Sequence, residues 1–323
     1  MTDLPASPPP PYPPYPPPPL SLVAVRASRK WLGPRGGWWI FLGMTAFWLF
    51  NVLFDQLVDH NVGLSPNSLV LGGFGMTAAL IYTLAYRLKP SDGISVVRLI
   101  LAFLFGGLLA TELAVLIEAP LVDVVLRSNP NAELITRSLA GIIEEACKII
   151  AVVIAARGLT TRTARSGLFL GGAVGLGFAA FEDMKYAAAA LTDTLVGHSP
   201  LLSIITTTFG RDLIGPLEHP VMTALLASVL FAATRNGRFR ITWRVVIAYL
   251  AIAAVHGLID ALPTLLVPVV GNQNVANGLG ATLDILIALG SGVVWLVYSR
   301  RLNRRILGAQ TIPVLPSAEP PGA

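Results

Sequence analysis

Charged residues are scarce in this sequence. Only 13% of its 323 residues are Asp, Glu, Lys or Arg, whereas 54% are hydrophobic. A soluble domain usually carries about 25% charged residues, so this composition excludes an ordinary soluble enzyme or binding module. The mean hydropathy of +0.68 indicates a membrane protein instead.

Cysteine is almost absent as well. The single cysteine, Cys147, lies inside an apolar run, which excludes an internal disulfide and any zinc site built from several cysteines. No secretory signal peptide pattern is visible. The formal net charge of +5 mainly reflects basic residues in membrane loops, so we expect no nucleic-acid partner.

Proline is concentrated at one end of the chain. Eleven of the 25 prolines lie within residues 1–19, where they favour polyproline II or disorder because proline lacks a backbone donor and fixes φ. We expect a proline-rich, disordered cytoplasmic tail over residues 1–30, a helical transmembrane domain over 31–306 and a disordered tail over 307–323. A proline-reading partner is the alternative to a merely flexible N-terminal tail.

Long apolar runs occupy most of the remaining sequence. A membrane-spanning helix needs about 20 mostly apolar residues, and eight windows meet this requirement. The windows are residues 37–58, 68–86, 96–118, 132–156, 168–191, 212–233, 245–268 and 279–299. We therefore expect an all-α, polytopic membrane protein with about eight transmembrane helices.

Basic residues alternate between the two sides of these windows. Eighteen of the 23 Lys and Arg residues fall before the first window or next to the connections that follow every second window. Arg127, Arg137 and Arg211 fall on the opposite side, and Lys148 and Lys185 lie within windows. Because cytoplasmic loops are enriched in Lys and Arg, this alternation predicts that both termini are cytoplasmic. The short loops leave little room for a soluble domain, so we expect the chemistry to take place in the transmembrane part.

Ionisable residues nevertheless occur deep inside several windows. The segment AGIIEEACKII, residues 140–150, carries Glu144, Glu145 and Lys148. Each such charge costs about 2.5–3.5 kcal/mol on insertion scales, so it usually has a function or a pairing partner. At a rise of about 1.5 Å per residue, six ionisable residues on four windows fall within one slab about 10 Å thick. The six are Glu144, Lys148, Glu182, His219, His256 and Asp260.

Spacing along the helices also favours a common centre. Glu144 and Lys148 are four residues apart, and so are His256 and Asp260 in the segment HGLID. Residues at this spacing lie on one face of a helix, as paired metal ligands on a helix do.

These residues resemble the PrsW family of intramembrane proteases, whose motifs are EExxK, FxxxE and HxxxD on successive helices, with another histidine before the last motif. Here the motifs read Glu144-Glu145-Ala-Cys-Lys148, Phe178-Ala-Ala-Phe-Glu182 and His256-Gly-Leu-Ile-Asp260, and the other histidine is His219. The resemblance covers about residues 130–265. The chain is more distantly similar to CAAX prenyl proteases and bacteriocin-processing proteases, with EExxxR and FxxxH patterns that it does not match.

The resemblance implies hydrolysis of peptide bonds in the membrane. Hydrolysis needs a general base, an activated water and a donor for the oxyanion. Glu144 or Glu145 is the expected base, and the choice between them stays open. Lys148 is expected to pair with a glutamate and keep it ionised.

A metal ion is the second open point. Glu144, Glu145, Glu182, Asp260 and Lys148 sum to −3 if all are ionised, which favours Zn²⁺ or another divalent cation at the centre. Protonation of some carboxylates is the competing explanation, with a water activated by glutamate alone and no cofactor. Two histidines and a carboxylate form a familiar catalytic zinc set. The expected ligands, or otherwise donors and orienting groups, are His219, His256, Asp260 and Glu182.

The resemblance further implies a membrane-protein or peptide substrate within the lipid bilayer. An anti-sigma-factor-like substrate, cut near the external face of a bacterial plasma membrane, is the specific expectation, while the substrate-binding residues stay unassigned. The rival function is a proton-coupled transporter that uses the same Glu, His and Asp side chains as a relay. Helix breaks of the kind found in transporters are expected at Pro216 and Pro220, and at Pro263.

Overall fold

The computed structural model describes residues 32–58, 66–192 and 199–310. Within these ranges every long regular segment is a helix, and the β-type pairing consists of an isolated bridge between Arg235 and Arg238. The expected all-α class is therefore confirmed for this part of the chain. The tail predicted over residues 1–30 lies outside the described residues, and so do residues 311–323 of the C-terminal tail.

The helices follow one another through short connections. Their bounds are α1 Gly36–Val58, α2 Pro66–Arg87, α3 Val96–Leu104, η4 Phe105–Ala110, α4 Thr111–Pro120, η5 Leu121–Leu126, α5 Ala132–Ala155, α6 Ala164–Thr192, α7 Pro200–Ala232, α8 Trp243–Val270 and α9 Gln273–Gln310. α3, η4, α4 and η5 join end to end into one rod, in which η4 and η5 are π-helical. Two short 3-10 turns, η1 Gly33–Arg35 and η3 Pro90–Asp92, precede α1 and α3.

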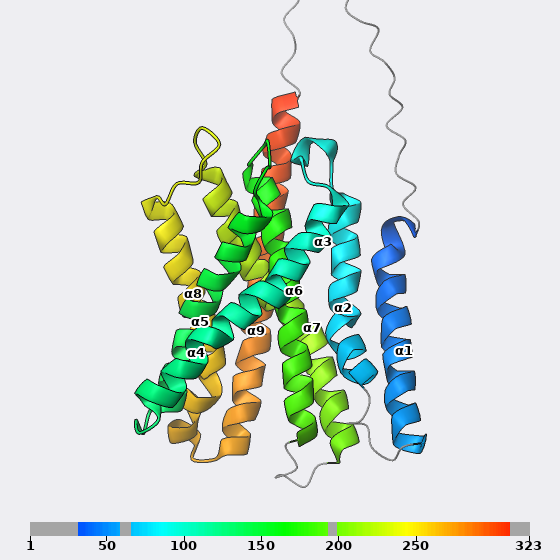
Figure 1. The fold of residues 1–323 in the computed structure, drawn as a ribbon, viewed down its shortest axis with the longest axis vertical. Helices are drawn as coiled ribbons and strands as arrows, with labels where there is room; N and C mark the ends of the chain where they lie inside the picture. Colours follow the sequence, from blue (N-terminus) through cyan, green and yellow to red (C-terminus); the bar gives the residue numbers. More distant parts are fainter. Residues whose placement is uncertain (1–31, 59–65, 193–198, 311–323) are drawn as a thin grey trace, which may run out of the picture.

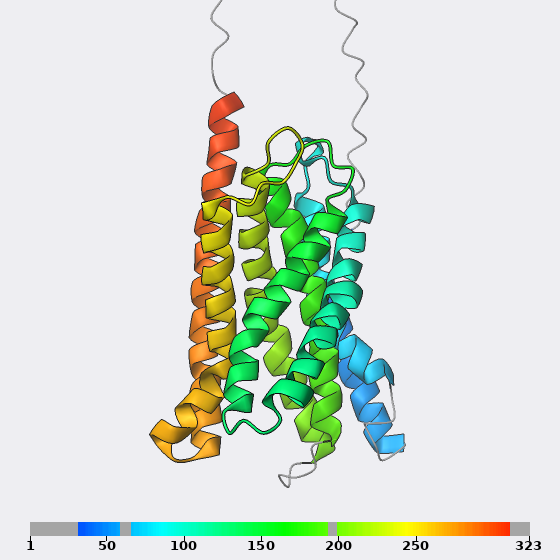
Figure 2. The same cartoon turned by 60° about the vertical axis from the view of Figure 1, so that its left-hand side comes forward.

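α6 lies at the centre of the bundle. In its most apolar stretch 89% of the residues are buried, against 11% for α1 and for α9. α6 packs mainly along α7, while α1 lies at the edge beside α2 (Figure 1). α8 and α9 run side by side on another flank (Figure 2). The start of α1 and the end of α9 lie at the same end of the bundle (Figure 1).

Six helices in the described ranges are long and apolar enough to cross a membrane. They are Gly33–Val58, Asn67–Arg87, Val96–Asp123, Ala164–Ala190, Trp243–Val270 and Gln273–Leu302. The two remaining windows, 132–156 and 212–233, correspond to α5 and α7, which belong to the same bundle (Figure 1). α5 is less apolar than a simple span because it carries Glu144, Glu145 and Lys148.

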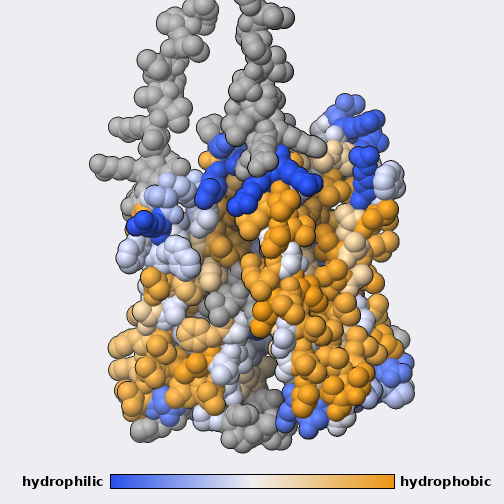
Figure 3. Space-filling view, turned by 180° about the vertical axis from the view of Figure 1, so that it is seen from behind, coloured by the Kyte–Doolittle hydropathy of each residue, from blue (hydrophilic) through white to orange (hydrophobic). Residues whose placement is uncertain are grey.

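Large hydrophobic side chains cover the outside of the bundle. Figure 3 shows a broad hydrophobic surface with hydrophilic residues gathered at its upper rim. Trp39 on α1, Ile247 on α8 and Leu286 on α9 are 63%, 56% and 59% exposed. In water so large an apolar surface would cause aggregation, whereas the hydrocarbon of a bilayer suits it. The protein is an integral, multi-pass membrane protein.

Close helix contact joins α5 and α8 near the polar residues. A side chain at Gly141 would collide with the backbone of Gly257, and one at Gly257 would collide with the backbone of Ser138. Glycine at both positions therefore lets the two backbones touch. Because Gly141 lies one turn before Glu144 and Gly257 follows His256, this contact sets the distance between their side chains.

Three expectations about the helices are wrong. α7 begins at Pro200 rather than near residue 212, because its first turns are too rich in Ser and Thr to register as an apolar window. α9 continues to Gln310, past residue 307, where the C-terminal tail was expected to begin. Finally, α7 runs without interruption through Pro216 and Pro220, and α8 through Pro263. Transmembrane helices tolerate proline because neighbouring groups and local adjustments satisfy the freed backbone carbonyl.

Candidate active site

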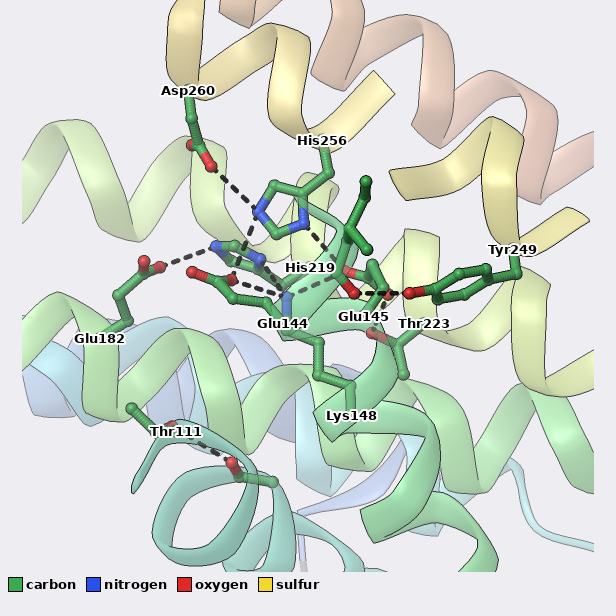
Figure 4. Close-up of polar contacts among 12 residues, drawn as sticks. Thr111, Glu144, Glu145, Lys148, Glu182, His219, Thr223, Tyr249, His256 and Asp260 are labelled. Carbon is green, nitrogen blue, oxygen red and sulfur yellow. Dashed lines mark hydrogen bonds and ion pairs between the residues drawn. The ribbon is translucent and has the colours of Figure 1, made fainter. Parts of the chain in front are cut away.

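Lys148 lies at the middle of a buried polar cluster (Figure 4). Its Nζ is 3.2 Å from Glu144 Oε2 and 2.9 Å from Glu145 Oε1. The centroid of the Phe178 ring lies 3.9 Å from the same nitrogen. Residues three and four apart share one face of a helix, which is why a single turn of α5 presents all three charged groups. Two carboxylates and an aromatic face thus replace the water that a lysine normally requires.

Glu145 is held from three directions and has no exposed surface. Lys148 Nζ donates to its Oε1, His256 Nδ1 lies 3.1 Å from the same oxygen, and Thr223 Oγ1 donates to Oε2 over 3.5 Å. A carboxylate only accepts hydrogen bonds, so we assign the proton of the His256 ring to Nδ1. Glu145 therefore fixes the orientation of His256 from behind.

His219 on α7 connects α5 with α6. Lys148 Nζ lies 3.0 Å from its Nδ1, and Glu182 Oε2 lies 2.8 Å from its Nε2. Since an ammonium group only donates, Nδ1 must accept and Nε2 carries the proton that faces Glu182. Glycine at position 175 of α6 leaves room for the His219 carbonyl, which brings the two helices close enough for this contact.

Arg211 on α7 holds the two neighbouring carboxylates of α6. Its Nη2 lies 2.7 Å from Glu182 Oε2, and its Nε lies 2.5 Å from Asp183 Oδ1. Its guanidinium carbon also lies 3.8 Å from the centroid of the Tyr186 ring. The sequence reasoning placed Arg211 outside the windows and missed this pairing. The eight-residue spacing to His219, about two helical turns on one face, is the signal that an earlier start of α7 would have revealed.

A cavity of about 670 Å³ opens beside the cluster, within the ~300–1,000 Å³ typical of ligand pockets. Glu144, Glu182 and Asp260 line it. Glu145 and Lys148 are fully buried and lie behind its wall. Of the three charged residues in the EExxK motif, Glu144 is thus the one whose carboxylate meets the cavity.

Several buried groups are close enough together to hold a metal ion. Ligand atoms of Glu144, His219 and His256 lie within 4.8 Å of one another. His256 Nε2 is buried without a hydrogen-bond partner, yet it lies 3.5 Å from both Glu144 Oε2 and Asp260 Oδ2. Donors that share one tetrahedral zinc ion lie about 3.4 Å apart, so His256 Nε2 lies at a suitable distance from each of these two carboxylates, and His219 completes the group of Glu144, His219 and His256. A carboxylate on the far nitrogen, here Glu145, is the usual support of a metal-binding histidine.

The residues predicted from the sequence meet in one connected cluster. They are Glu144, Glu145, Lys148, Glu182, His219, His256 and Asp260. Contact alone does not assign their chemical roles, which stay predictions. Sequence reasoning did not find Thr223, a small polar residue like many others in membrane helices.

In a multi-pass, all-helical membrane protein, this many carboxylates and two histidines at one buried centre mark a functional site inside the membrane. Residues 95–291 match the family described as PrsW family intramembrane metalloprotease. The match spans more than half of the chain, and the chain belongs to the PrsW family. This membership identifies it as a membrane protease, a hydrolase. Neither the curated proteins nor the solved structures contained a match.

Proposed function

We propose that the protein hydrolyses peptide bonds of membrane-protein substrates inside the bilayer, with Glu144 as the general base. The observation that carries this proposal is the position of Glu144: its carboxylate lines the cavity and also lies 3.5 Å from His256 Nε2. Glu145 is less suited to this role because three donors already occupy it.

Glu144 takes a proton from the attacking water and returns it to the leaving amine, a role usually worth about 10²- to 10⁴-fold in rate. Lys148, 3.2 Å away, supplies positive charge next to the carboxylate that carries the proton. Glu145 holds the His256 ring in one tautomer and one orientation. Glu182, fixed by His219 and Arg211, forms the opposite wall and orients the substrate segment.

We propose further that a divalent cation, zinc in the first instance, is held by the buried group of Glu144, His219 and His256, with Asp260 beside His256 as a further ligand. His219 would exchange one of its present partners, Lys148 or Glu182, for the ion. The five carboxylates of the cluster, those of Glu144, Glu145, Glu182, Asp183 and Asp260, and its two cations leave a formal charge of −3. Such an ion would act as a Lewis acid on the substrate carbonyl and lower the pKa of a bound water. The alternative is a metal-free site in which Glu144 alone activates the water.

Metal analysis of purified protein separates these two mechanisms. We expect about one equivalent of zinc per chain, lost in His256→Asn, and activity that a chelator abolishes and zinc restores. Full activity after complete removal of metal would exclude the metal-dependent mechanism and support activation of the water by Glu144 alone.

We propose that α5 and α7 also cross the bilayer, which gives eight spans, and that both termini are cytoplasmic in a bacterial plasma membrane. The cavity is lined by Val122 at the end of the α3–η5 rod and by Ala132 at the start of α5. These positions lie at the end of the bundle opposite the start of α1 and the end of α9 (Figure 1). This placement supports cleavage near the external face, as expected for an anti-sigma-factor-like substrate.

The test compares membranes that contain the wild-type chain or Glu144→Gln. We expect single-span membrane proteins whose fragments accumulate with the wild type and disappear with the variant. Ion flux is assayed in parallel, because the rival transporter would lose flux in Glu144→Gln while every membrane protein stayed intact.

A further inference from the structure

Two charged side chains outside the cluster stand on the outer surface of the membrane-spanning helices. Glu112 on α4 and Lys185 on α6 form an ion pair of 3.3 Å, and their side chains are 61% and 46% exposed. Both lie inside apolar stretches long enough to cross a membrane, and Lys185 is about one turn from Glu182. Ionisable side chains within membrane-spanning segments are costly and usually mark a functional path.

The ion pair bridges two helices that border the cavity. α4 contributes Val115 and Glu118 to its lining, and α6 contributes Lys185, Tyr186 and Glu182. Val115 is 40% exposed and Tyr186 45% exposed, so the cavity reaches the outer surface between these helices. We call this boundary the α4–α6 seam.

The neighbouring boundaries are closed by backbone contact. α5 and α8 meet through Gly141 and Gly257, as described above. α3 and η4 meet α6 in the same way, since a side chain at Gly106 would collide with the Val174 carbonyl and one at Gly177 with the Phe103 carbonyl. Contacts between α4 and α6 are sparse by comparison. Figure 1 shows the rod diverging from α6 beyond the contacts made by α3 and η4.

The secondary structure of the rod marks α4 as a separate segment. π-helical turns flank it on both sides, η4 at Phe105–Ala110 and η5 at Leu121–Leu126, and Pro120 ends it. π-helical turns in α-helices are frequently found at functional sites, and proline is a usual position for a kink. The two ends of α4 are therefore the positions at which we expect the rod to bend, with α3 and η4 packed on α6.

We propose that the α4–α6 seam is the opening through which a transmembrane segment of the substrate enters the cavity, and that the Glu112–Lys185 pair holds this opening closed. The inference rests on the proposed protease function, because it assigns the path to the same cavity.

The lining of the cavity favours a peptide over a lipid. An unwound transmembrane segment exposes N–H and C=O groups that need partners inside the bilayer. Arg137, Thr136 and Glu133 of α5 line the cavity and supply both donors and acceptors, whereas an acyl chain could use neither. The carboxylates of Glu118, Glu144 and Asp260 at the same cavity would also repel an anionic headgroup.

Charge exchange tests the pair itself. Glu112→Lys and Lys185→Glu each place like charges across the seam, and the double exchange restores an attractive pair. We expect each single variant to cleave a single-span substrate about two- to fivefold faster than the wild type, the factor expected for an exposed ion pair. The double variant should return to the wild-type rate. Single variants that match the wild type, or a double variant that stays as fast as they are, would overturn this role.

Cross-linking tests the opening. In a Cys147→Ala background, Glu112→Cys and Lys185→Cys are bridged by a bis-maleimide that contains a reducible disulfide. The matched control bridges Ile142→Cys and Tyr249→Cys on the α5–α8 boundary, where the Tyr249 hydroxyl donates to the Ile142 carbonyl over 2.6 Å and neither residue lines the cavity. Both proteins are compared with the background enzyme, whose activity is established first, so a failed protease proposal is recognised at that step.

We expect the 112–185 bridge to reduce cleavage of the single-span substrate at least about tenfold and reduction of the bridge to restore it, while the 142–249 bridge leaves cleavage unchanged. Cleavage that continues with the 112–185 bridge in place would overturn the proposal. Equal loss with both bridges would also overturn it, because rigidity of the bundle would then explain the result.

Discussion

Glu144 and Glu145 are adjacent in sequence but have different surroundings. Glu145 faces the packed interface of α5, α7 and α8, where three donors hold it. Glu144 faces the cavity and keeps the single hydrogen bond from Lys148. Adjacent residues on a helix point about 100° apart, so one glutamate can serve the structure while the other is left for chemistry.

The two glutamates are therefore expected to respond differently to the same substitution. Glu144→Gln should lower cleavage at least about 100-fold with little change in unfolding temperature, since Lys148 keeps Glu145 as its partner. Glu145→Gln removes charge from a fully buried pair, which typically costs about 3 kcal/mol or more, and should lower the unfolding temperature markedly. Cleavage assays and thermal unfolding in detergent measure both effects. Equal stability of the two variants would contradict this division of roles.

Arg211 holds two carboxylates through the shape of its guanidinium group as well as through its charge. Arg211→Lys keeps the positive charge, but an ammonium group cannot reproduce the fork that contacts Glu182 and Asp183 together. We expect a loss of about 1.5–3 kcal/mol for a lost charged hydrogen bond, together with a lower kcat because Glu182 is less well fixed. Arg127→Lys, at an exposed position, is the control and should change neither quantity. An Arg211→Lys variant with wild-type kcat would show that charge alone suffices.

At the scale of the helices, contacts between backbones determine which polar groups meet. The motif residues come from α5, α6, α7 and α8, which are far apart in the sequence, so only the packing of these helices brings the residues together. Gly141 against Gly257 brings Glu144 to His256, and Gly175 against the His219 carbonyl brings α6 to α7. Small residues are the usual means of close helix approach in membranes, so these glycines are part of the active-site architecture.

Gly141→Ala tests this dependence. The added methyl group would overlap the backbone of Gly257, and such overpacking costs about 1–3 kcal/mol. We expect a lower unfolding temperature and slower cleavage, because α8 must move away with His256. Gly43→Ala on α1 is the matched control: nothing lies near its added methyl group, and alanine favours a helix over glycine by about 1 kcal/mol. That variant should be as stable as the wild type or more so.

For the whole molecule, sequence reasoning was most accurate for contacts between residues of the same helix. The pairs Glu144–Lys148 and His256–Asp260 follow from a spacing of four residues, and both pairs are in contact. Matching depth correctly grouped the side chains of four helices. Depth does not say which helices are neighbours. It therefore could not predict the cavity or the different environments of Glu144 and Glu145. The pairing of Arg211 with Glu182 and Asp183 was missed because hydropathy placed the start of α7 too late.

The distribution of basic residues gives the molecule a direction that can be measured. The connections after α2, α5 and α7 lie at the same end as the start of α1 and the end of α9, whereas those after η5 and α8 lie at the other end (Figure 1). With cytoplasmic termini, single cysteines at Asn129 and Asn272 in a Cys147→Ala background should react with a membrane-impermeant maleimide in intact cells. Cysteines at Thr160 and Arg240 should react after the membrane is opened. All four positions are exposed, so accessibility within the protein does not distinguish them. Labelling of Thr160→Cys or Arg240→Cys in intact cells would reverse the orientation, and with it the expectation that substrates are cut near the external face.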